Sequence, residues 1–555
     1  MLRQPLDTKV AHEAAAAPAR VVKKEAQRRR RRAGVVLPLF SIRSGAGWGV
    51  GEIPDIARFA AWAGKAGFSV LQLLPVNPTS GADPSPYASV SAFGLDPIYL
   101  SLDDCEDFQA LGSRDALPEA LRRRIDEVEH AQRVEWTAVR DLKNAAVELT
   151  FERFRRDEWE NRTPRGRQLA EFMRDNREWL DDYTLFAVWH HQTNRAWTDW
   201  PYGPRERTPE ALARLRREQS AELLRESWLQ WQLNRQWRRA RRQASAEGVE
   251  LMGDLPFVVG LDSADVWANR LLFRIDRRLG TPPDDSSKTG QDWGLPVYDW
   301  DAMRQDEFSW IRRRAQRAGE LFSIYRVDHA IGCYRTFSRP VAPPIPGQTQ
   351  PPEPLAGDFS PGDEGEQIQL GERLMRIMSR FGEVIAEDLG AVPPYLRPSL
   401  ERMGIAGYRV LRWEKEQDQD RTRFRDPASW PEISAATNAT HDTDTTAAWW
   451  DKLKPEERKE LQTVPALANL DPEAGFGPPV RDAILRALYG ASSTLTLTMF
   501  EDLLGGFGRI NDPGKNDGTN WTYRAPKTVD ELDKDQEMTR RLAELSAETG
   551  RTVAR

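Results

Sequence analysis

The stretch that decides the fold runs Phe322-Ser-Ile-Tyr-Arg-Val-Asp-His-Ala330. Its first residues favour a strand, and an arginine, an aspartate and a histidine then follow within four positions. Because side chains alternate along a strand, we expect Arg326 and Asp328 to point to the same side and to pair. A neighbouring guanidinium lowers the pKa of a carboxylate. The pair therefore fits either a nucleophile that must stay ionised or a salt bridge at the end of a buried strand.

Seven further runs in the chain have the same strand-like character as 322–328. They are 35–39, 69–74, 249–254, 383–387, 407–413, 437–442 and 494–500. Between the first two runs, residues 53–66 carry helical spacing and stop at Gly67, which predicts a β-α-β unit with parallel strands. Helical stretches also separate several of the later runs. Eight parallel strands with intervening helices predict a (β/α)8 barrel of the TIM type.

The strands are unevenly spaced, and the long gaps predict insertions into the barrel. About 175 residues that look almost wholly helical separate the second strand from the third. We expect 102–200 to form an inserted helical subdomain and 208–246 to form one long helix. Residues 340–366 are rich in Pro, Gly and acidic residues, which predicts a mobile loop after the fourth strand. The barrel should span 34–530, followed by a helix and tail over 531–555, with no C-terminal β-sandwich domain.

Composition and charge limit the possible classes of function. The chain has 555 residues, a formal net charge of -6 and two cysteines, so neither nucleic-acid binding nor a disulfide framework is indicated. No apolar run approaches the roughly 20 residues that span a bilayer, and no signal peptide is visible. We expect a cytoplasmic protein. Residues 1–33 contain the basic run 28–32 and are expected to be a disordered tail, with contact to a polyanion as the alternative.

Polar residues follow several of the predicted strands, namely Asn77, Asp254, Asp328-His329, Glu387-Asp388 and His441-Asp442. In a barrel, the carboxyl ends of all strands open on one face, where active sites lie. The cluster has no cysteine and only two histidines, so a zinc site is not indicated. No phosphate-binding loop motif is present. Paired carboxylates suit cleavage of a glycosidic bond, and a retaining enzyme holds them roughly 5–5.5 Å apart.

Several blocks of sequence resemble the amylomaltases, which are 4-α-glucanotransferases of glycoside hydrolase family 77, related to the α-amylases. The central blocks are Tyr325-Arg-Val-Asp-His-Ala330, Ala386-Glu-Asp-Leu-Gly390 and Thr440-His-Asp-Thr-Asp-Thr445. Others are Trp48-Gly-Val-Gly51, Ser85-Pro-Tyr87, Gly253-Asp-Leu-Pro256, Asp262-Ser-Ala-Asp-Val-Trp-Ala268, Glu501-Asp-Leu-Leu-Gly505, Arg509-Ile-Asn511 and Asn520-Trp521. The resemblance covers roughly residues 34–525 and implies transfer of α-1,4-glucan segments to sugar acceptors.

The resemblance also implies roles for single residues. Asp328 would be the nucleophile, Glu387 the acid/base and Asp442 the residue that stabilises the distorted sugar. Substrate would also contact Arg326, His441, Tyr87, Asp254, Ser85 and Trp293. No metal or organic cofactor is implied. The expected partners are α-1,4-glucans and maltooligosaccharides, and the protein is expected to be a monomer or a weak homodimer. A retaining α-1,4-glucan hydrolase and a non-catalytic glucan-binding protein remain as alternatives.

Overall fold

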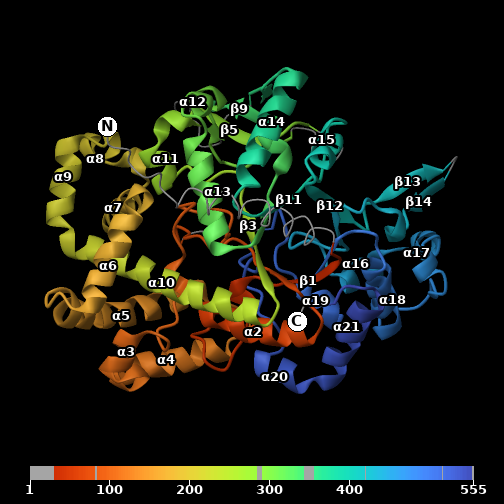
Figure 1. Ribbon diagram of the computed structural model, residues 1–555, viewed down its shortest axis with the longest axis horizontal. Helices are drawn as coiled ribbons and strands as arrows, with labels where there is room; N and C mark the ends of the chain where they lie inside the picture. Colours follow the sequence, from red (N-terminus) through yellow and green to blue (C-terminus); the bar gives the residue numbers. More distant parts are fainter. Residues whose placement is uncertain are drawn as a thin grey trace, which may run out of the picture.

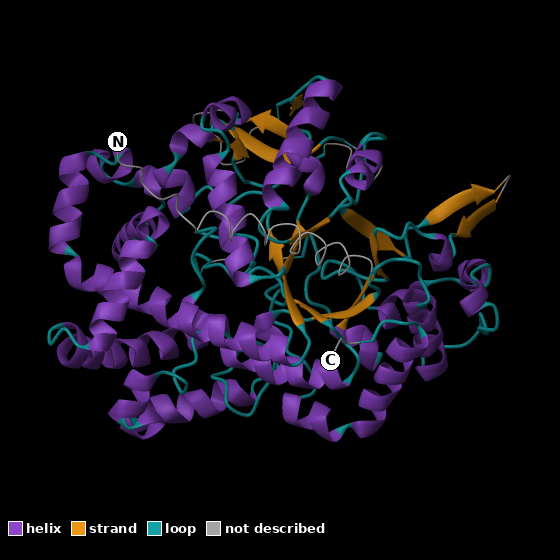
Figure 2. Ribbon diagram, viewed as in Figure 1, coloured by secondary structure: helices purple, strands orange, loops and turns teal. Residues whose placement is uncertain are grey.

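The fold is built around a closed barrel of eight parallel strands. The computed structural model describes residues 30–81, 84–283, 290–342, 355–418, 421–515 and 517–552. The barrel strands follow the order β1-β16-β15-β12-β11-β8-β3-β2 and form the central orange ring in Figure 2. They are β1 (Arg32–Val36), β2 (Val70–Gln72), β3 (Glu250–Leu255), β8 (Ile324–Val327), β11 (Glu383–Ala386), β12 (Ala406–Val410), β15 (Ser434–Thr437) and β16 (Leu495–Met499). The predicted (β/α)8 barrel is therefore confirmed.

Two barrel strands begin three residues earlier in the chain than predicted. β1 starts at Arg32 and ends at Val36, because Pro38 has no N–H to give to a ladder and the chain enters a 3-10 turn over Leu39–Ser41. β15 covers Ser434–Thr437, whereas the prediction was 437–442. The chain turns after Thr437, whose hydroxyl donates a hydrogen bond to the carbonyl of Ala439 (2.8 Å). The residues from 438 to 442 consequently form a loop above the barrel.

Helices surround the barrel, and Figure 1 shows them on all sides of the ring. Those close to the barrel are α2 (Ile53–Lys65), α10 (Ser220–Ala246), α13 (Ser309–Leu321), α14 (Glu364–Met378), α15 (Leu396–Arg402), α16 (Thr446–Lys452), α17 (Pro455–Leu461), α18 (Pro478–Tyr489) and α19 (Phe500–Leu504). The chain ends in α20 (Val529–Lys534) and α21 (Gln536–Glu548). The indole of Trp62 on α2 donates to the hydroxyl of Thr539 on α21 (3.1 Å), so α21 packs against α2. A hairpin of β13 (Lys415–Asp418) and β14 (Arg421–Phe424) projects from the barrel (Figure 1).

A group of helices between β2 and β3 lies beside the barrel (Figure 1). Its members are α3 (Glu106–Leu111), α4 (Glu119–His130), α5 (Trp136–Phe154), α6 (Pro164–Asp175), α7 (Arg177–Thr193), α8 (Tyr202–Glu206) and α9 (Pro209–Glu218). The single helix predicted over 208–246 is wrong, because α9 and α10 are separate. Gln219 between them leaves helical geometry (φ -113°, ψ 24°). This break lets α9 take its own direction and bury Leu212 and Leu215.

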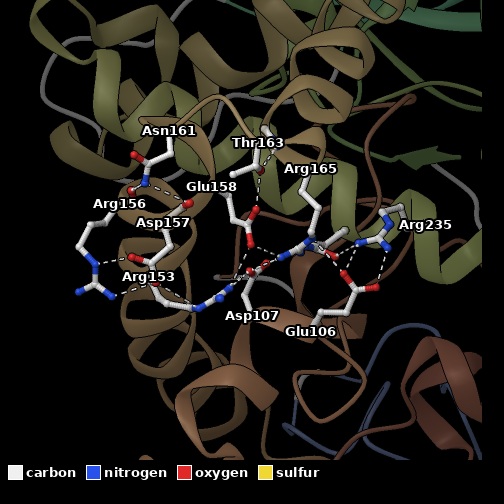
Figure 3. Close-up of polar contacts among 12 residues, drawn as sticks. Glu106, Asp107, Arg153, Arg156, Asp157, Glu158, Asn161, Thr163, Arg165 and Arg235 are labelled. Atoms are coloured by element: carbon white, nitrogen blue, oxygen red, sulfur yellow. Dashed lines mark hydrogen bonds and ion pairs between the residues drawn. The ribbon is translucent and has the colours of Figure 1, made fainter.

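A buried carboxylate holds the inserted helices together. Asp107 at the start of α3 is fully buried and accepts hydrogen bonds from Arg153 of α5 (2.7 Å) and from Arg165 of α6 (2.6 and 2.7 Å) (Figure 3). Gln232 of α10 donates to the same carboxylate (3.2 Å). Removing one partner from a buried charged cluster of this kind costs several kcal/mol. The cluster therefore joins the insertion to α10, a helix that packs on the barrel.

Short strands and helices complete the fold around the barrel. β5 (Arg277–Thr281), β6 (Gln291–Asp292), β9 (Thr336–Pro340) and β10 (Asp358–Ser360) form a small sheet, β4 (Phe273–Arg274) pairs with β7 (Val297–Tyr298), and α11 (Ala264–Ala268) and α12 (Trp300–Gln305) lie nearby. The loop predicted over 340–366 is thus bounded by β9 on one side and by β10 and the start of α14 on the other, and its residues 343–354 lie outside the described residues. Residues 1–29, which make up most of the predicted tail, also lie outside the described residues. In the part of the chain that the structure describes, no helix has the length and apolarity to cross a membrane.

Candidate active site

Strand register brings three acidic residues and one arginine to the same end of the barrel. Asp254 of β3 pairs in register with Arg326 of β8, so the two side chains lie next to each other inside the barrel. β8 pairs with β11 through Val327 and Ala386, and the residues that follow, Asp328 and Glu387, are therefore neighbours. The backbone N–H of Asp328 donates to the carbonyl of Leu255 (3.0 Å), and that of Glu387 donates to the carbonyl of Val327 (3.0 Å). The strand ends place these side chains at the face where barrel active sites lie.

The guanidinium of Arg326 holds Asp328 in a fixed position. It is buried and donates from Nε to Oδ1 of Asp254 (2.8 Å) and from Nη2 to Oδ1 of Asp328 (2.7 Å). The phenol of Tyr87 completes this arrangement, because it donates to Oδ2 of Asp254 (2.7 Å) and accepts from Nη2 of Arg326 (3.1 Å). Ser85 lies on the same turn, and its hydroxyl accepts from the N–H of Tyr87 (3.4 Å). One cation is thus shared between two carboxylates and a phenol.

Burial and charge separate the protonation of the two central carboxylates. Burial raises the pKa of Asp328, and Arg326 offsets only part of that increase. The expectation that Arg326 gives this carboxylate a low pKa is wrong in its net direction, because burial outweighs a guanidinium that is shared with Asp254. Burial and the negative charge of Asp328 raise the pKa of Glu387 to about 7. Asp328 therefore loses its proton first, and Glu387 remains partly protonated near neutral pH.

Backbone N–H groups orient the Glu387 carboxylate. The N–H of His329 donates to its Oε2 (2.8 Å), and the N–H of Leu389 donates to its Oε1 (3.1 Å). His329 has a left-handed backbone (φ 44°), and its ring packs against Phe257 (centroids 5.7 Å apart) and Trp293 (4.9 Å). Burial lowers the pKa of His329 to about 4, so the imidazole is neutral near pH 7. Trp293 consequently lies next to the loop that carries Asp328.

A third carboxylate, Asp442, projects from the loop after β15. Its Oδ1 accepts from the amide of Asn511 (2.6 Å), and its Oδ2 lies 3.2 Å from Nε2 of His441. Burial disfavours the charge of Asp442, but His441 and Asn511 outweigh burial and lower the pKa of this carboxyl below its usual range. Arg509 donates to the backbone carbonyl of Asp442 (2.9 Å). The side chain of Asp442 is 44% exposed, so this carboxylate is accessible to a ligand.

Aromatic rings connect the two halves of the site. Tyr87 stacks on His441 with centroids 5.2 Å apart and planes 14° from parallel. Trp521 packs against both, at 5.8 Å from Tyr87 and 5.9 Å from His441. The structure thus brings all the candidate residues into one region. Ser85 reaches it through its hydrogen bond with Tyr87, and Trp293 through its ring contact with His329. The sequence prediction assigned no role to Asn511 or Trp521. The sequence indicated them only as members of the blocks 509–511 and 520–521, which follow the last strand.

The chemistry available to this site follows from its charge states. One carboxylate is ionised and aligned by an arginine, while another keeps a proton near neutral pH. That division of roles between two carboxyl groups is what cleavage of a glycosidic bond requires. Among the residues that the structure describes, no group of three or more His, Cys, Asp or Glu side chains has the arrangement of a metal site.

Comparison with known proteins identifies close matches over most of the chain. The family model described as 4-alpha-glucanotransferase, glycoside hydrolase family 77, matches residues 37–529. The 4-alpha-glucanotransferase of Chlamydia pneumoniae is 31% identical over 514 residues, which cover 90% of this chain and 92% of the relative. The chloroplastic/amyloplastic 4-alpha-glucanotransferase of Solanum tuberosum is 30% identical over 524 residues, covering 91% and 84%. The structure of an amylomaltase from Streptococcus agalactiae in complex with acarbose has a TM-score of 0.77 at 24% identity, covering 94% of this chain and 100% of that one, and shows the same fold.

Proposed function

The chain belongs to the 4-alpha-glucanotransferase family, and we propose that it transfers α-1,4-glucan segments to glucose or maltooligosaccharide acceptors through a covalent intermediate on Asp328. The observation that carries this mechanism is the pair of neighbouring carboxylates at the ends of β8 and β11. Asp328 is aligned by Arg326, and Glu387 has a raised pKa. An ionised nucleophile beside a protonated acid is the arrangement of a retaining glycosidase.

In the first half of the proposed reaction, an oxygen of Asp328 attacks the anomeric carbon of the donor glucan. The bond from that carbon to the leaving sugar breaks, and Glu387 gives its proton to the leaving oxygen. The charge of Asp328 is consumed in the ester that forms. Because this charge helped to raise the pKa of Glu387, the pKa then falls and Glu387 becomes the better base.

In the second half, a hydroxyl of the acceptor sugar gives its proton to Glu387 and attacks the anomeric carbon. The ester bond breaks and restores the Asp328 carboxylate. Asp442 has a low pKa, so it remains ionised throughout and would bind hydroxyls of the distorted sugar. His441 beside it and the phenol of Tyr87 would line the same subsite, and Trp293 would contact a sugar next to His329.

The substrate and the mechanism can be tested separately. Incubation with maltotriose should give glucose and a ladder of longer maltooligosaccharides. Shorter products alone would mean hydrolysis, and unchanged maltotriose would mean binding without catalysis. For the mechanism, Glu387→Gln should cleave glucans slowly but release fluoride in a burst from α-maltosyl fluoride, whose leaving group needs no proton. A covalent adduct on Asp328 should then be visible by mass spectrometry of the intact protein. Slow fluoride release with no adduct would exclude Glu387 as the acid/base.

A further inference from the structure

Trp521 has a strained backbone next to the active site. Its φ angle is 63°, in the left-handed region that bulky side chains rarely adopt, and its side chain is almost fully buried. Such a conformation persists only where the surroundings fix it, and it is found most often where function needs one exact placement. The contacts of Trp521 therefore indicate what its placement serves.

The inserted helices hold this strained backbone in place. The N–H of Trp521 donates to the carbonyl of Ile510 (2.8 Å), and its own carbonyl accepts from the indole N–H of Trp136 (3.0 Å). The next carbonyl, of Thr522, accepts from the N–H of Val134 (2.9 Å). Val134 lies in the connection between α4 and α5, and Trp136 is the first residue of α5; we call residues 131–136 together the α4–α5 turn. Arg524 donates back to the carbonyl of Ala131 in this turn (2.7 Å).

The indole of Trp521 supports two rings of the active site at once. It packs against Tyr87 and His441, which stack on each other. Tyr87 bonds to both Asp254 and Arg326, and Arg326 aligns Asp328. A displacement of Trp521 would therefore be transmitted to Asp328 through the ring of Tyr87 and the guanidinium of Arg326.

We propose that Trp521 is a positioning residue for the catalytic site and that the α4–α5 turn of the helical insertion holds it there. The proposal rests on the proposed glucan transfer and adds a task for the insertion. If the turn loosens, Tyr87 and His441 lose their support and Asp328 is less firmly paired with Arg326. Turnover then falls, while sugar units that bind away from the bond that is cleaved keep their contacts.

The decisive variant is Trp136→Phe, because it removes the N–H that bonds to Trp521 but keeps a ring against Phe40 (5.4 Å). The matched control is Trp200→Phe. Trp200 is buried whereas Trp136 is half-buried, and the indole of Trp200 likewise donates to a backbone carbonyl, that of Arg195 (2.9 Å). Each variant loses one hydrogen bond of the same kind, and because Trp200 is the more buried of the two, the melting temperature of Trp200→Phe should fall at least as far as that of Trp136→Phe.

The two variants should differ in catalysis. With maltotriose, Trp136→Phe should lower kcat about three- to tenfold, the usual effect of one lost hydrogen bond, and should leave KM within about twofold. The acid limb of its pH profile should move to higher pH, because a looser contact with Arg326 makes Asp328 harder to ionise. Trp200→Phe should keep the kcat and pH profile of the wild type. Equal losses of kcat in both variants would mean general destabilisation and would overturn the proposal.

Hydrogen exchange measures the effect of the α4–α5 turn on Tyr87 and His441 without requiring turnover. Peptides that contain Tyr87 and His441 should exchange faster in Trp136→Phe than in the wild type or in Trp200→Phe. If exchange and kcat are both unchanged in Trp136→Phe, the proposal is wrong. If the wild-type protein makes no ladder from maltotriose, the proposed function fails, and the exchange result alone decides whether Trp521 is positioned by the insertion.

Discussion

Replacing Glu387 with glutamine should change how the stability of the protein depends on pH. In the folded protein, burial and the charge of Asp328 raise the pKa of Glu387 from 4.5 to about 7. The unfolded chain therefore releases this proton at a lower pH than the folded protein does. The contribution of Glu387 to the free energy of unfolding of the wild type consequently decreases as the pH rises from about 4.5 to about 7. Glutamine does not ionise, so the variant does not undergo this loss.

The size of the effect follows from the two pKa values. A pKa of about 7 in place of 4.5 corresponds to about 3 kcal/mol of unfolding free energy. The variant also carries a fixed cost. Its amide oxygen can still accept from the N–H of His329, but its NH2 group then faces the N–H of Leu389, and two opposed donors cost about 1–3 kcal/mol. Because this cost is independent of pH, the stability of the variant relative to the wild type should improve by about 3 kcal/mol between pH 4.5 and pH 8.

Urea unfolding of both proteins across this pH range measures the difference directly. Asp442→Asn is a control that should show no trend in this range. Although burial opposes it, His441 and Asn511 lower the pKa of Asp442 below its ordinary value of 3.8, so the stability that this group contributes is complete above that pH and is lost only in stronger acid. The difference between the asparagine variant and the wild type should therefore stay constant from about pH 4.5 to pH 8. A Glu387→Gln difference that stays constant to within about 0.5 kcal/mol from pH 4.5 to pH 8 would refute the reasoning, because it would mean that Glu387 titrates alike in both states.

Four further variants test other parts of the site and fold. Asp328→Asn should keep its fold and lose nearly all turnover, since an amide does not form the glycosyl ester; turnover within about tenfold of the wild type would place the nucleophile elsewhere. Tyr87→Phe removes a hydroxyl that bonds to two charged groups, so kcat for maltotriose should fall about 10- to 100-fold, and the melting temperature should fall too because the buried carboxylate of Asp254 loses a donor. Deleting residues 1–29 should leave urea unfolding and turnover unchanged. Extending the deletion through Arg32 should cost about 3–5 kcal/mol, because this buried arginine pairs with Glu383; equal stability of both deletions would contradict that pairing.

The barrel could be predicted from the sequence because buried parallel strands appear as short apolar runs. Seven of the eight runs correspond to strands, whereas the run 437–442 meets β15 only at Thr437. β15 has the sequence Ser434-Ala-Ala-Thr437, in which only Thr437 is of a type common in strands. The predicted strand therefore starts at Thr437, where the observed one ends. The break between α9 and α10 had no signal either, since Gln219 is a good helix former and only the tertiary packing of α9 explains its conformation.

The central carboxylates could also be predicted, because residues at the ends of parallel strands meet at one face. Asp254, Asp328 and Glu387 follow this rule. Asn511 and Trp521 do not, because they lie in a loop after the last strand, where no hydrophobic period relates sequence to position. Their contacts with Asp442 and Tyr87 depend on the path of that loop, which is set by hydrogen bonds to distant parts of the chain.

Strands and loops thus determine different properties of this site. The register of β3, β8 and β11 determines which side chains are neighbours, and the polar residues that end these strands are visible in the sequence. The proton affinities of those side chains depend on how completely water is excluded and on which charges lie nearby. The fall in the pKa of Asp442 comes from His441 and Asn511, which lie on two different loops. Relatives that keep the strand ends but change these loops should therefore keep the two central carboxylates while differing in the pH at which they work.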